Sequence, residues 1–146
     1  MRVTVVVPTY NERENLPVAV ERLTALPVPD LHVLVVDDNS PDGTGEVADK
    51  LAADLPNVVS VLHRTEKDGL GRAYIAGITQ ALDEGADVVI QMDADLSHPA
   101  EVIPAMLEKL SSPDVGVVLG SRYVPGGSTA AEWKWYRKAL SAWANF

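Results

Sequence analysis

Cysteine is absent from this sequence, basic residues are scarce, and long hydrophobic runs are missing. The lack of cysteine excludes disulfides, zinc–cysteine sites and thiol catalysis, and it is compatible with a reducing cytoplasm. Lys and Arg number 12 against 21 Asp and Glu, and the formal charge of -9 argues against nucleic-acid binding. No apolar run approaches the roughly 20 residues that span a bilayer. Because Met1-Arg2-Val3 enters a predicted strand directly, we expect no signal peptide.

The sequence does contain enough apolar material for a core. Its 146 residues are 47% hydrophobic, which predicts one domain over residues 1–146. The charge is unevenly distributed, since residues 122–146 carry four basic side chains and one acidic one, a local net charge of +3. That asymmetry predicts that the C-terminal segment meets an anionic partner.

Short β-branched runs alternate with stretches of helical period along the chain. The runs predict strands at 3–7, 31–36, 58–62, 88–92 and 115–120. The periodic stretches predict helices at 15–26, 44–55, 70–82 and 99–110, the last begun by proline. The runs are continuously apolar, as in strands covered on both faces. We therefore predict an α/β fold with a doubly wound, mostly parallel sheet, whose strand-end loops converge on one edge.

The sharpest signal for a site is a pair of aspartates, Asp93 and Asp95, directly after the fourth predicted strand. On an extended segment, side chains two residues apart point the same way. Two neighbouring carboxylates repel each other unless a cation lies between them, and hard cations such as Mg²⁺ or Mn²⁺ prefer oxygen ligands. A paired cap-and-turn role is the alternative. We favour a metal that bridges to a substrate diphosphate.

The segment after the first strand, at residues 8–15, carries an aromatic side chain and a possible helix cap. Tyr10 would stand at the sheet edge, where it could cover a nucleobase. Asn11 and Glu14 have the spacing of a capping box. Taken alone, this segment is a weak signal for function.

The segment after the second strand, at residues 37–44, is acidic and rich in turn residues. Asp42 fits a solvated turn or cap position. The adjacent pair Asp37 and Asp38 is harder to explain by structure alone, because a carboxylate at a strand end can accept from the donors of a base or a ribose.

The segments after the third and fifth strands offer glycines and basic residues. Gly69 and Gly71 could let backbone N–H groups approach a phosphate, although helix–sheet packing explains them better. His63 reads as a plain strand-end histidine, and His98 as a residue at a helix start. Arg122 is either a surface arginine or a bidentate phosphate ligand.

The C-terminal residues 129–146 predict a basic helix that contains all three tryptophans. Aromatic and small residues fall on one face, and basic residues such as Lys134 and Lys138 on another. One interpretation is a helix that packs on the core with a solvated side. The other is an interfacial helix with its aromatics toward lipid and its basic side chains toward phosphate headgroups. Both remain open.

Taken together, the strand-end motifs resemble those of glycosyltransferase family 2, which has the Rossmann-like GT-A fold, and within it the polyprenol-phosphate (dolichyl-phosphate) mannose synthases. The resemblance covers essentially the whole chain in the right order. It rests on five motifs: Pro8-Thr9-Tyr10-Asn11-Glu12-Arg13-Glu14-Asn15, Asp37-Asp38-Asn39-Ser40-Pro41-Asp42-Gly43-Thr44, Gly69-Leu70-Gly71, Asp93-Ala94-Asp95-Leu96-Ser97-His98 and Gly120-Ser121-Arg122-Tyr123.

The resemblance implies an inverting enzyme that moves mannose from GDP-mannose to a polyprenyl phosphate, with Mg²⁺ or Mn²⁺ as cofactor. Asp95 and Arg122 would be catalytic, and Asp93 and Asp95 would hold the metal. The donor would be bound by Pro8, Tyr10, Glu12, Val36, Asp38, Asp93, Ala94 and Asp95. The acceptor phosphate would be gripped by Arg122, Arg137 and Ser141.

The same resemblance implies a peripheral protein at the cytoplasmic face of a membrane, either alone or with a membrane-anchoring domain or subunit. It implies no nucleic-acid partner. Members of the family continue past Phe146, so this chain would correspond to their N-terminal, nucleotide-sugar-binding portion.

The residues themselves favour a phosphate acceptor, because no convincing general base lies near the aspartates in the sequence. A hydroxyl acceptor normally needs such a base, whereas a phosphate is already anionic near neutral pH. Two alternatives stay open. One is a polyprenol-phosphate glucosyltransferase that uses UDP-glucose, and the other is a truncated, non-catalytic nucleotide-binding module.

Overall fold

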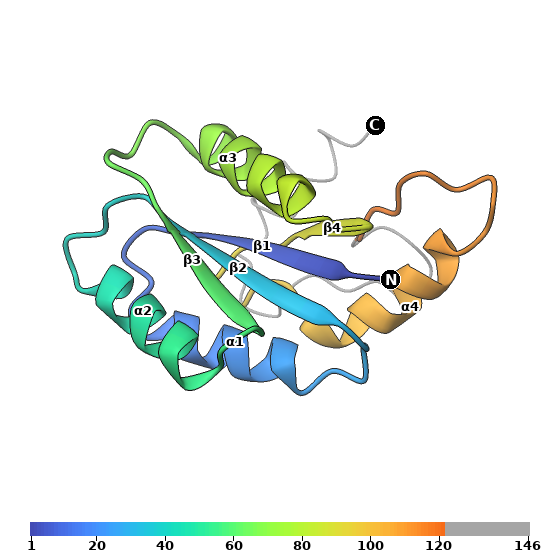
Figure 1. Ribbon diagram of the computed structural model, residues 1–146, viewed down its shortest axis with the longest axis horizontal. Helices are drawn as coiled ribbons and strands as arrows, with labels where there is room; N and C mark the ends of the chain where they lie inside the picture. The colour runs from blue at the N-terminus through green and yellow to red at the C-terminus, as the bar shows by residue number, and fades with distance from the viewer. Residues whose placement is uncertain (122–146) are drawn as a thin grey trace, which may run out of the picture. The chain divides into compact units, whose positions relative to one another are not determined.

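The computed structural model describes residues 1–121, which form a first compact unit, Met1–Pro104, and the start of a second at Ala105. Strands and helices alternate along the chain (Figure 1). The strands are β1 (Val3–Thr9), β2 (Leu31–Asp37), β3 (Val59–His63) and β4 (Val88–Gln91). The helices are α1 (Asn15–Thr24), α2 (Thr44–Asp54), α3 (Leu70–Asp83), the 3-10 turn η1 (Ala100–Val102) and α4 (Ile103–Leu110).

All four strands are parallel, and they lie in the order β3-β2-β1-β4. The chain moves outward from β1 to β2 and β3, and then crosses back to place β4 on the other side of β1. Figure 1 shows α1 and α2 on one face of the sheet and α3 on the other. The strand order therefore reverses between β1 and β4, and in open α/β sheets ligands bind at the carboxyl ends of the strands beside such a point.

The core of the first unit is built on the two central strands. Every residue of β1 is buried, and so is every residue of β2 after Leu31, because helices cover both faces. On one face α1 buries Leu16, Ala19, Val20 and Leu23, which recur at the spacing of one helical stripe. Burial of this continuous valine-rich layer fixes the strand ends, and with them the loops that follow.

Helix α3 approaches the sheet closely because it carries a glycine at its contact point. A Cβ built on Gly77 would come within 2.4 Å of Val6 Cγ1 and 2.8 Å of Val36 Cγ2, which is closer than such atoms approach. Ala73 and Ala81, one helical turn to either side, are also buried. The small residues at this spacing thus place the backbone of α3 directly over β1 and β2.

The prediction of an α/β fold with a parallel, doubly wound sheet is confirmed, and four of the five strands form where the sequence placed them. The predicted helix over 99–110 begins instead as the 3-10 turn η1 and continues as α4.

The fifth predicted strand, at 115–120, is wrong, since these residues form neither helix nor strand. Val117 and Leu119 are 74% and 83% exposed. An apolar run forms a strand only when a neighbouring strand supplies its hydrogen-bond partners, and the run itself does not reveal whether one is present.

No helix among residues 1–121 is long and apolar enough to cross a membrane.

Candidate functional site

The strand order brings three of the predicted motifs to one edge of the sheet. The segments at 10–14, 38–44 and 92–98 follow β1, β2 and β4, which are neighbours in the sheet. The strand β1 continues to Thr9, whereas its last pair with β4 joins Val6 to Gln91. Tyr10, Asp38 and Asp93 therefore all leave the carboxyl edge of adjacent strands, at the point where the strand order reverses.

The end of β4 presents the two aspartates that gave the sharpest signal. Asp93 is partly buried, and its Oδ1 accepts a hydrogen bond of 2.6 Å from the hydroxyl of Tyr74 on α3. Asp95 is exposed, and its Oδ1 accepts from the backbone N–H of Ser97 at 3.0 Å. Both aspartates are close enough for their charges to act on the Tyr74 hydroxyl.

The Tyr74 hydroxyl remains a donor in this setting. Burial raises its pKa, and the bond to Asp93 and the negative charges of Asp93 and Asp95 raise it further. A group that keeps its proton can only donate to a carboxylate, so the contact has one direction.

The donor set at the end of β4 suits a metal that is shared with a bound phosphate. Among residues 1–121, no group of three or more acidic or histidine side chains could hold a metal ion alone. Mg²⁺ and similar ions are usually held by one or two carboxylates, with phosphate oxygens and water completing the shell. Asp93 and Asp95 supply the carboxylates of such a site, which would be completed by a diphosphate.

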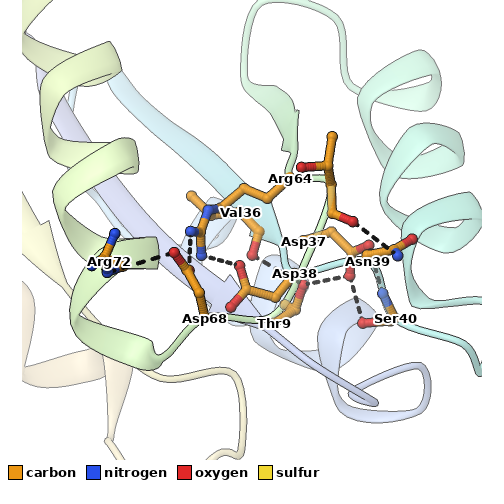
Figure 2. Close-up of polar contacts among 10 residues, drawn as sticks. Thr9, Val36, Asp37, Asp38, Asn39, Ser40, Arg64, Asp68 and Arg72 are labelled. Atoms are coloured by element: carbon orange, nitrogen blue, oxygen red, sulfur yellow. Dashed lines mark hydrogen bonds and ion pairs between the residues drawn. The ribbon is translucent and has the colours of Figure 1, made fainter.

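The end of β2 is organised differently, because hydrogen bonds within the protein occupy its first aspartate (Figure 2). Asp37 is buried, and its Oδ1 accepts from Thr9 Oγ1 at 3.2 Å and from Ser40 Oγ at 2.6 Å. Its Oδ2 accepts from the backbone N–H of Ser40 at 3.1 Å. Asp37 therefore ties the tip of β1 to the turn after β2 and is a structural residue.

The second aspartate, Asp38, pairs with an arginine that follows β3. Arg64 Nη1 lies 2.5 Å from Asp38 Oδ1, and the side chains are 15% and 6% exposed. The other arm of Arg64 reaches Asp68, which also receives Arg72 Nε at 3.6 Å (Figure 2). The bond with Asp68 raises the pKa of Arg64, burial opposes this, and Asp38 adds to the rise. The network fixes the carboxylate of Asp38 at the strand end.

The segment after β1 places an aromatic ring beside the β3–α3 loop. The ammonium of Lys67 lies 3.5 Å from the centre of the Tyr10 ring, which is a cation–π contact. Glu12 accepts from Asn15 Nδ2 at 2.8 Å, and its own backbone N–H donates to Thr44 Oγ1 at 3.0 Å. One face of the Tyr10 ring is thus covered by the ammonium of Lys67.

The predicted capping box between Asn11 and Glu14 is not formed. Asn11 adopts a left-handed backbone with φ of 61°, and its N–H donates to Ser40 Oγ at 3.1 Å. No side chain caps the start of α1, where the carbonyl of Glu12 accepts from Asn15 and Leu16 instead. The left-handed turn points Asn11 toward the β2 loop and away from the helix.

Asp42 acts as the predicted turn residue, while Gly43 occupies the N-cap position of α2. Asp42 Oδ1 accepts from the N–H of Thr44 at 3.0 Å and from the Thr44 hydroxyl at 2.5 Å, at the start of α2. The hydroxyl of Thr44 lowers the pKa of Asp42.

Three residues assigned to the donor by resemblance are buried at the same edge. Pro8 and Ala94 lie at the ends of β1 and β4, and Val36 is fully buried beneath Gly77 of α3. The carbonyl of Val36 accepts from Thr9 Oγ1 at 3.4 Å. These residues shape the floor of the strand ends rather than presenting polar groups.

The predicted role of Gly69 and Gly71 in helix–sheet packing is wrong. A Cβ at either position would meet no atom within 4 Å, whereas Gly77 makes the close approach. Gly69 has φ of 110°, so its conformation explains why glycine precedes α3. The sequence pattern pointed to the first glycines of the helix, but the contact depends on which face turns toward the sheet.

The two histidines at this edge are both bound to neighbours. His63 Nε2 lies 2.7 Å from Asp49 Oδ1 on α2, and His98 Nδ1 lies 3.2 Å from Ser97 Oγ. The pairing of His63 agrees with its interpretation as a strand-end histidine. The residues expected to act on an acceptor, Arg122, Arg137 and Ser141, lie outside the described residues, and so does the tryptophan-rich segment.

Sequence reasoning missed two side chains at this edge, Arg64 and Tyr74. Arg64 could have been found, because Asp37 pairs with His63 in the sheet register and the next residues, Asp38 and Arg64, must then be neighbours. Tyr74 follows the buried Ala73 on the helix that faces β4. A polar aromatic beside a stripe of small residues is its only signal.

A hollow of about 480 Å³ lies at the opposite, amino edge of the sheet, and His32 is among its lining residues. The ring nitrogens of His32 already contact the carbonyl of Asn57 at 3.3 Å and Ser60 Oγ at 2.8 Å. Because both ring nitrogens of His32 are engaged by the protein, and the acidic and aromatic motifs lie at the other edge, we place the functional site at the carboxyl edge.

The chain is similar to known proteins over almost its whole length. A family model described as glycosyl transferase family 2 matches residues 4–144. A polyprenol monophosphomannose synthase of Mycolicibacterium smegmatis is 50% identical over 144 residues, which are 99% of this chain and 53% of the relative. An undecaprenyl-phosphate mannosyltransferase of Micrococcus luteus is 54% identical over 145 residues, which are 99% of this chain and 57% of the relative. The chain spans about half the length of the curated relatives it matches.

A solved structure gives the same result for the fold. The mannosyltransferase from Pyrobaculum calidifontis, in complex with GDP-Man and Mn²⁺, superposes with a TM-score of 0.67 at 30% identity. The superposition covers 79% of this chain and 34% of that one. The sheet and helices described above are therefore the N-terminal part of a larger known architecture.

Proposed function

The chain belongs to glycosyl transferase family 2, and on that premise we propose that the protein moves mannose from GDP-mannose to the phosphate of a polyprenol. One observation carries the proposal. The neighbouring strands β2, β1 and β4 end in Asp38, Tyr10 and the segment Asp93–Asp95, so a carboxylate, an aromatic face and a second acidic segment share one edge. This spatial order suits a nucleotide sugar, because the carboxylate and the aromatic face can bind the base and the second acidic segment can bind the diphosphate through a metal.

The nucleoside would lie across the ends of β1 and β2. Tyr10 would stack on the base with the ring face opposite to the one that Lys67 covers. Asp38 would accept from the N–H groups of guanine, and the ion pair with Arg64 would hold the carboxylate in place. Glu12 lies after β1 beside them and would meet the ribose hydroxyls.

The diphosphate would lie over the end of β4. Asp93 and Asp95 fit a divalent cation that shares its shell with phosphate oxygens, and Mn²⁺ accompanies GDP-Man in the Pyrobaculum structure. When bound, the ion would neutralise negative charge on the leaving group. The chain's own part would be to hold both carboxylates toward that position, Asp93 through Tyr74 and Asp95 through its turn.

The acceptor would be a phosphate rather than a hydroxyl. His63, at the end of β3, pairs with Asp49 on α2, and the strands β2 and β1 separate it from the aspartates after β4, so it is not placed to act as a general base there. A lipid phosphate is anionic near neutral pH and attacks without losing a proton, so it needs positioning and charge compensation only. Arg122, Arg137 and Ser141 would supply these. Attack opposite the leaving group would invert the anomeric centre.

Such an acceptor requires the protein to work at a membrane surface. The local charge of +3 in residues 122–146 would favour an anionic lipid surface, and the tryptophans there suit an interface. We propose that the protein acts there as a peripheral protein on the cytoplasmic face, alone or with a membrane-anchoring domain or subunit.

Transfer of radiolabelled mannose from GDP-mannose to a polyprenyl phosphate, with Mn²⁺ or Mg²⁺ present, tests the proposal. We expect labelled lipid from GDP-mannose and none from UDP-glucose, and we expect GDP to compete for binding better than UDP. Preference for UDP would reject the donor assignment. Donor binding without any lipid product would reject the transfer and favour a nucleotide-binding module.

A further inference from the structure

Tyr74 is the described side chain that links helix α3 to the acidic end of β4. Its ring packs against the core cluster that contains Val6, Leu34 and Val36, and its hydroxyl donates to Asp93 Oδ1 at 2.6 Å. The ring is therefore anchored by apolar contacts, while the oxygen projects to the carboxylate. A tyrosine held in this way can fix a neighbour more firmly than a flexible polar side chain could.

The close packing of α3 on the sheet fixes the position of the Tyr74 hydroxyl relative to Asp93. Gly77 lies three residues further along the helix and contacts the sheet too closely for any side chain. Because Ala73 next to Tyr74 is also buried, the turn that bears the tyrosine cannot rise from the sheet without opening the core. The hydroxyl is thus set at a fixed distance from β4.

The hydrogen bond from Tyr74 involves only one of the two carboxylate oxygens of Asp93. Oδ1 is engaged by the tyrosine, and Oδ2 stands outside that contact. A carboxylate that would otherwise turn about its terminal bond is held in one orientation. Groups that hydrogen-bond metal-ligating side chains commonly orient them and strengthen the site.

We propose that Tyr74 is a positioning residue, whose hydroxyl holds Asp93 so that its second oxygen faces the divalent cation of the donor complex. This inference rests on the proposed function. Tyr74 would act through Asp93, without touching the nucleotide sugar. The alternative is a merely structural bond that joins α3 to β4.

Tyr74→Phe separates these roles, because it keeps the ring and removes only the hydroxyl. Mn²⁺ is titrated into the chain with GDP present, and bound Mn²⁺ is followed by electron paramagnetic resonance. We expect the apparent Kd for Mn²⁺ to rise about 10-fold, as for other partners of metal ligands. The affinity for GDP in EDTA should stay unchanged. Thr79→Ala is the matched control, since it removes an exposed hydroxyl from the same helix and should change neither value.

A double variant shows whether Tyr74 acts through Asp93. In the Asp93→Asn background, adding Tyr74→Phe should weaken Mn²⁺ binding no further. Equal Mn²⁺ affinity in Tyr74→Phe and the parent chain would overturn the inference. Additive losses of Mn²⁺ affinity in the double variant would also overturn it in favour of a structural bond. So would a loss of GDP affinity in Tyr74→Phe that is equal with and without metal. If the parent chain itself binds no Mn²⁺ with GDP, the proposed function fails first.

Discussion

Two strands of one sheet, β2 and β4, end in acidic pairs, and the two pairs differ in the donors that the protein supplies to them. At the end of β2, Asp37 receives three hydrogen bonds from Thr9 and Ser40, and Asp38 receives the guanidinium of Arg64. At the end of β4, the hydrogen bond that Asp93 receives comes from a neutral hydroxyl. A neutral donor orients a carboxylate without cancelling its charge.

The difference shows what an acidic pair at a strand end can mean. Protein donors occupy both oxygens of Asp37, and Arg64 holds Oδ1 of Asp38, so the β2 pair joins two strand tips and presents one fixed carboxylate. At the end of β4, Asp93 receives a neutral donor and keeps its carboxylate charge at the point where the strand order reverses. A cation brought by a ligand would be stabilised there, which is why we propose that the metal binds at the end of β4 and the nucleobase at the end of β2.

The largest expected effect distinguishes the end of β4 from the end of β2 by the metal dependence of donor binding. Asp95→Ala should weaken Mn²⁺-dependent binding of GDP-mannose by more than about 100-fold, or ~2.7 kcal/mol, because one of two carboxylate ligands is lost. Isothermal titration calorimetry measures it. Folding should be unaffected, since Asp95 is exposed. Unchanged calorimetry would contradict the assignment of the metal to β4.

The next effect should appear in stability. Asp37→Ala leaves the hydroxyl and the backbone N–H of Ser40 without this acceptor, and leaves the Thr9 hydroxyl only its longer contact with the Val36 carbonyl, which we expect to cost about 2 kcal/mol. Urea denaturation provides the measurement. The ratio of donor affinities with and without Mn²⁺ should stay the same. If that ratio falls as it does for Asp95→Ala, then the two ends share the metal and the contrast is false.

A smaller effect is expected from the helix that reaches both ends. Gly77→Ala places a methyl group against Val6 and Val36 and should lower stability by about 1–2 kcal/mol. By lifting α3, it should also weaken Mn²⁺ binding, because Tyr74 moves with the helix. Thermal unfolding and Mn²⁺ titration report the two effects.

Gly71→Ala is the matched control on the same helix. Its methyl group would meet open space, so it should stabilise the helix by about 0.5–1 kcal/mol and leave Mn²⁺ binding unchanged. A loss of stability in Gly71→Ala equal to that in Gly77→Ala would show that the close approach at Gly77 has no special role.

Most of the fold follows from the sequence because its signals are local. Continuous apolar runs and 3.6-residue periods placed β1 to β4 and α1 to α3 within a few residues. The exception, at 115–120, shows the limit of this reasoning. Val117 and Leu119 have strand propensity, but pairing with another strand is a long-range property that propensity does not contain.

The site was only partly predictable for the same reason. The acids at strand ends could be placed at one edge from the alternation of strands and helices alone. Which acid serves the fold depends on cross-strand partners such as Thr9 with Asp37, and which helix residue reaches Asp93 depends on the rotation of α3. These contacts join residues far apart in the sequence, so no single motif displays them.

The central claim is that the carboxylates after β4 bind the donor through a divalent cation. Calorimetric titration of GDP-mannose into the chain, once with Mn²⁺ and once with EDTA, tests it most directly. We predict strong binding with Mn²⁺ and binding weaker by more than about 100-fold in EDTA, a loss at least as large as that in Asp95→Ala, with the remaining affinity supplied by the nucleoside contacts at β1 and β2. Equal affinity under the two conditions would contradict the claim.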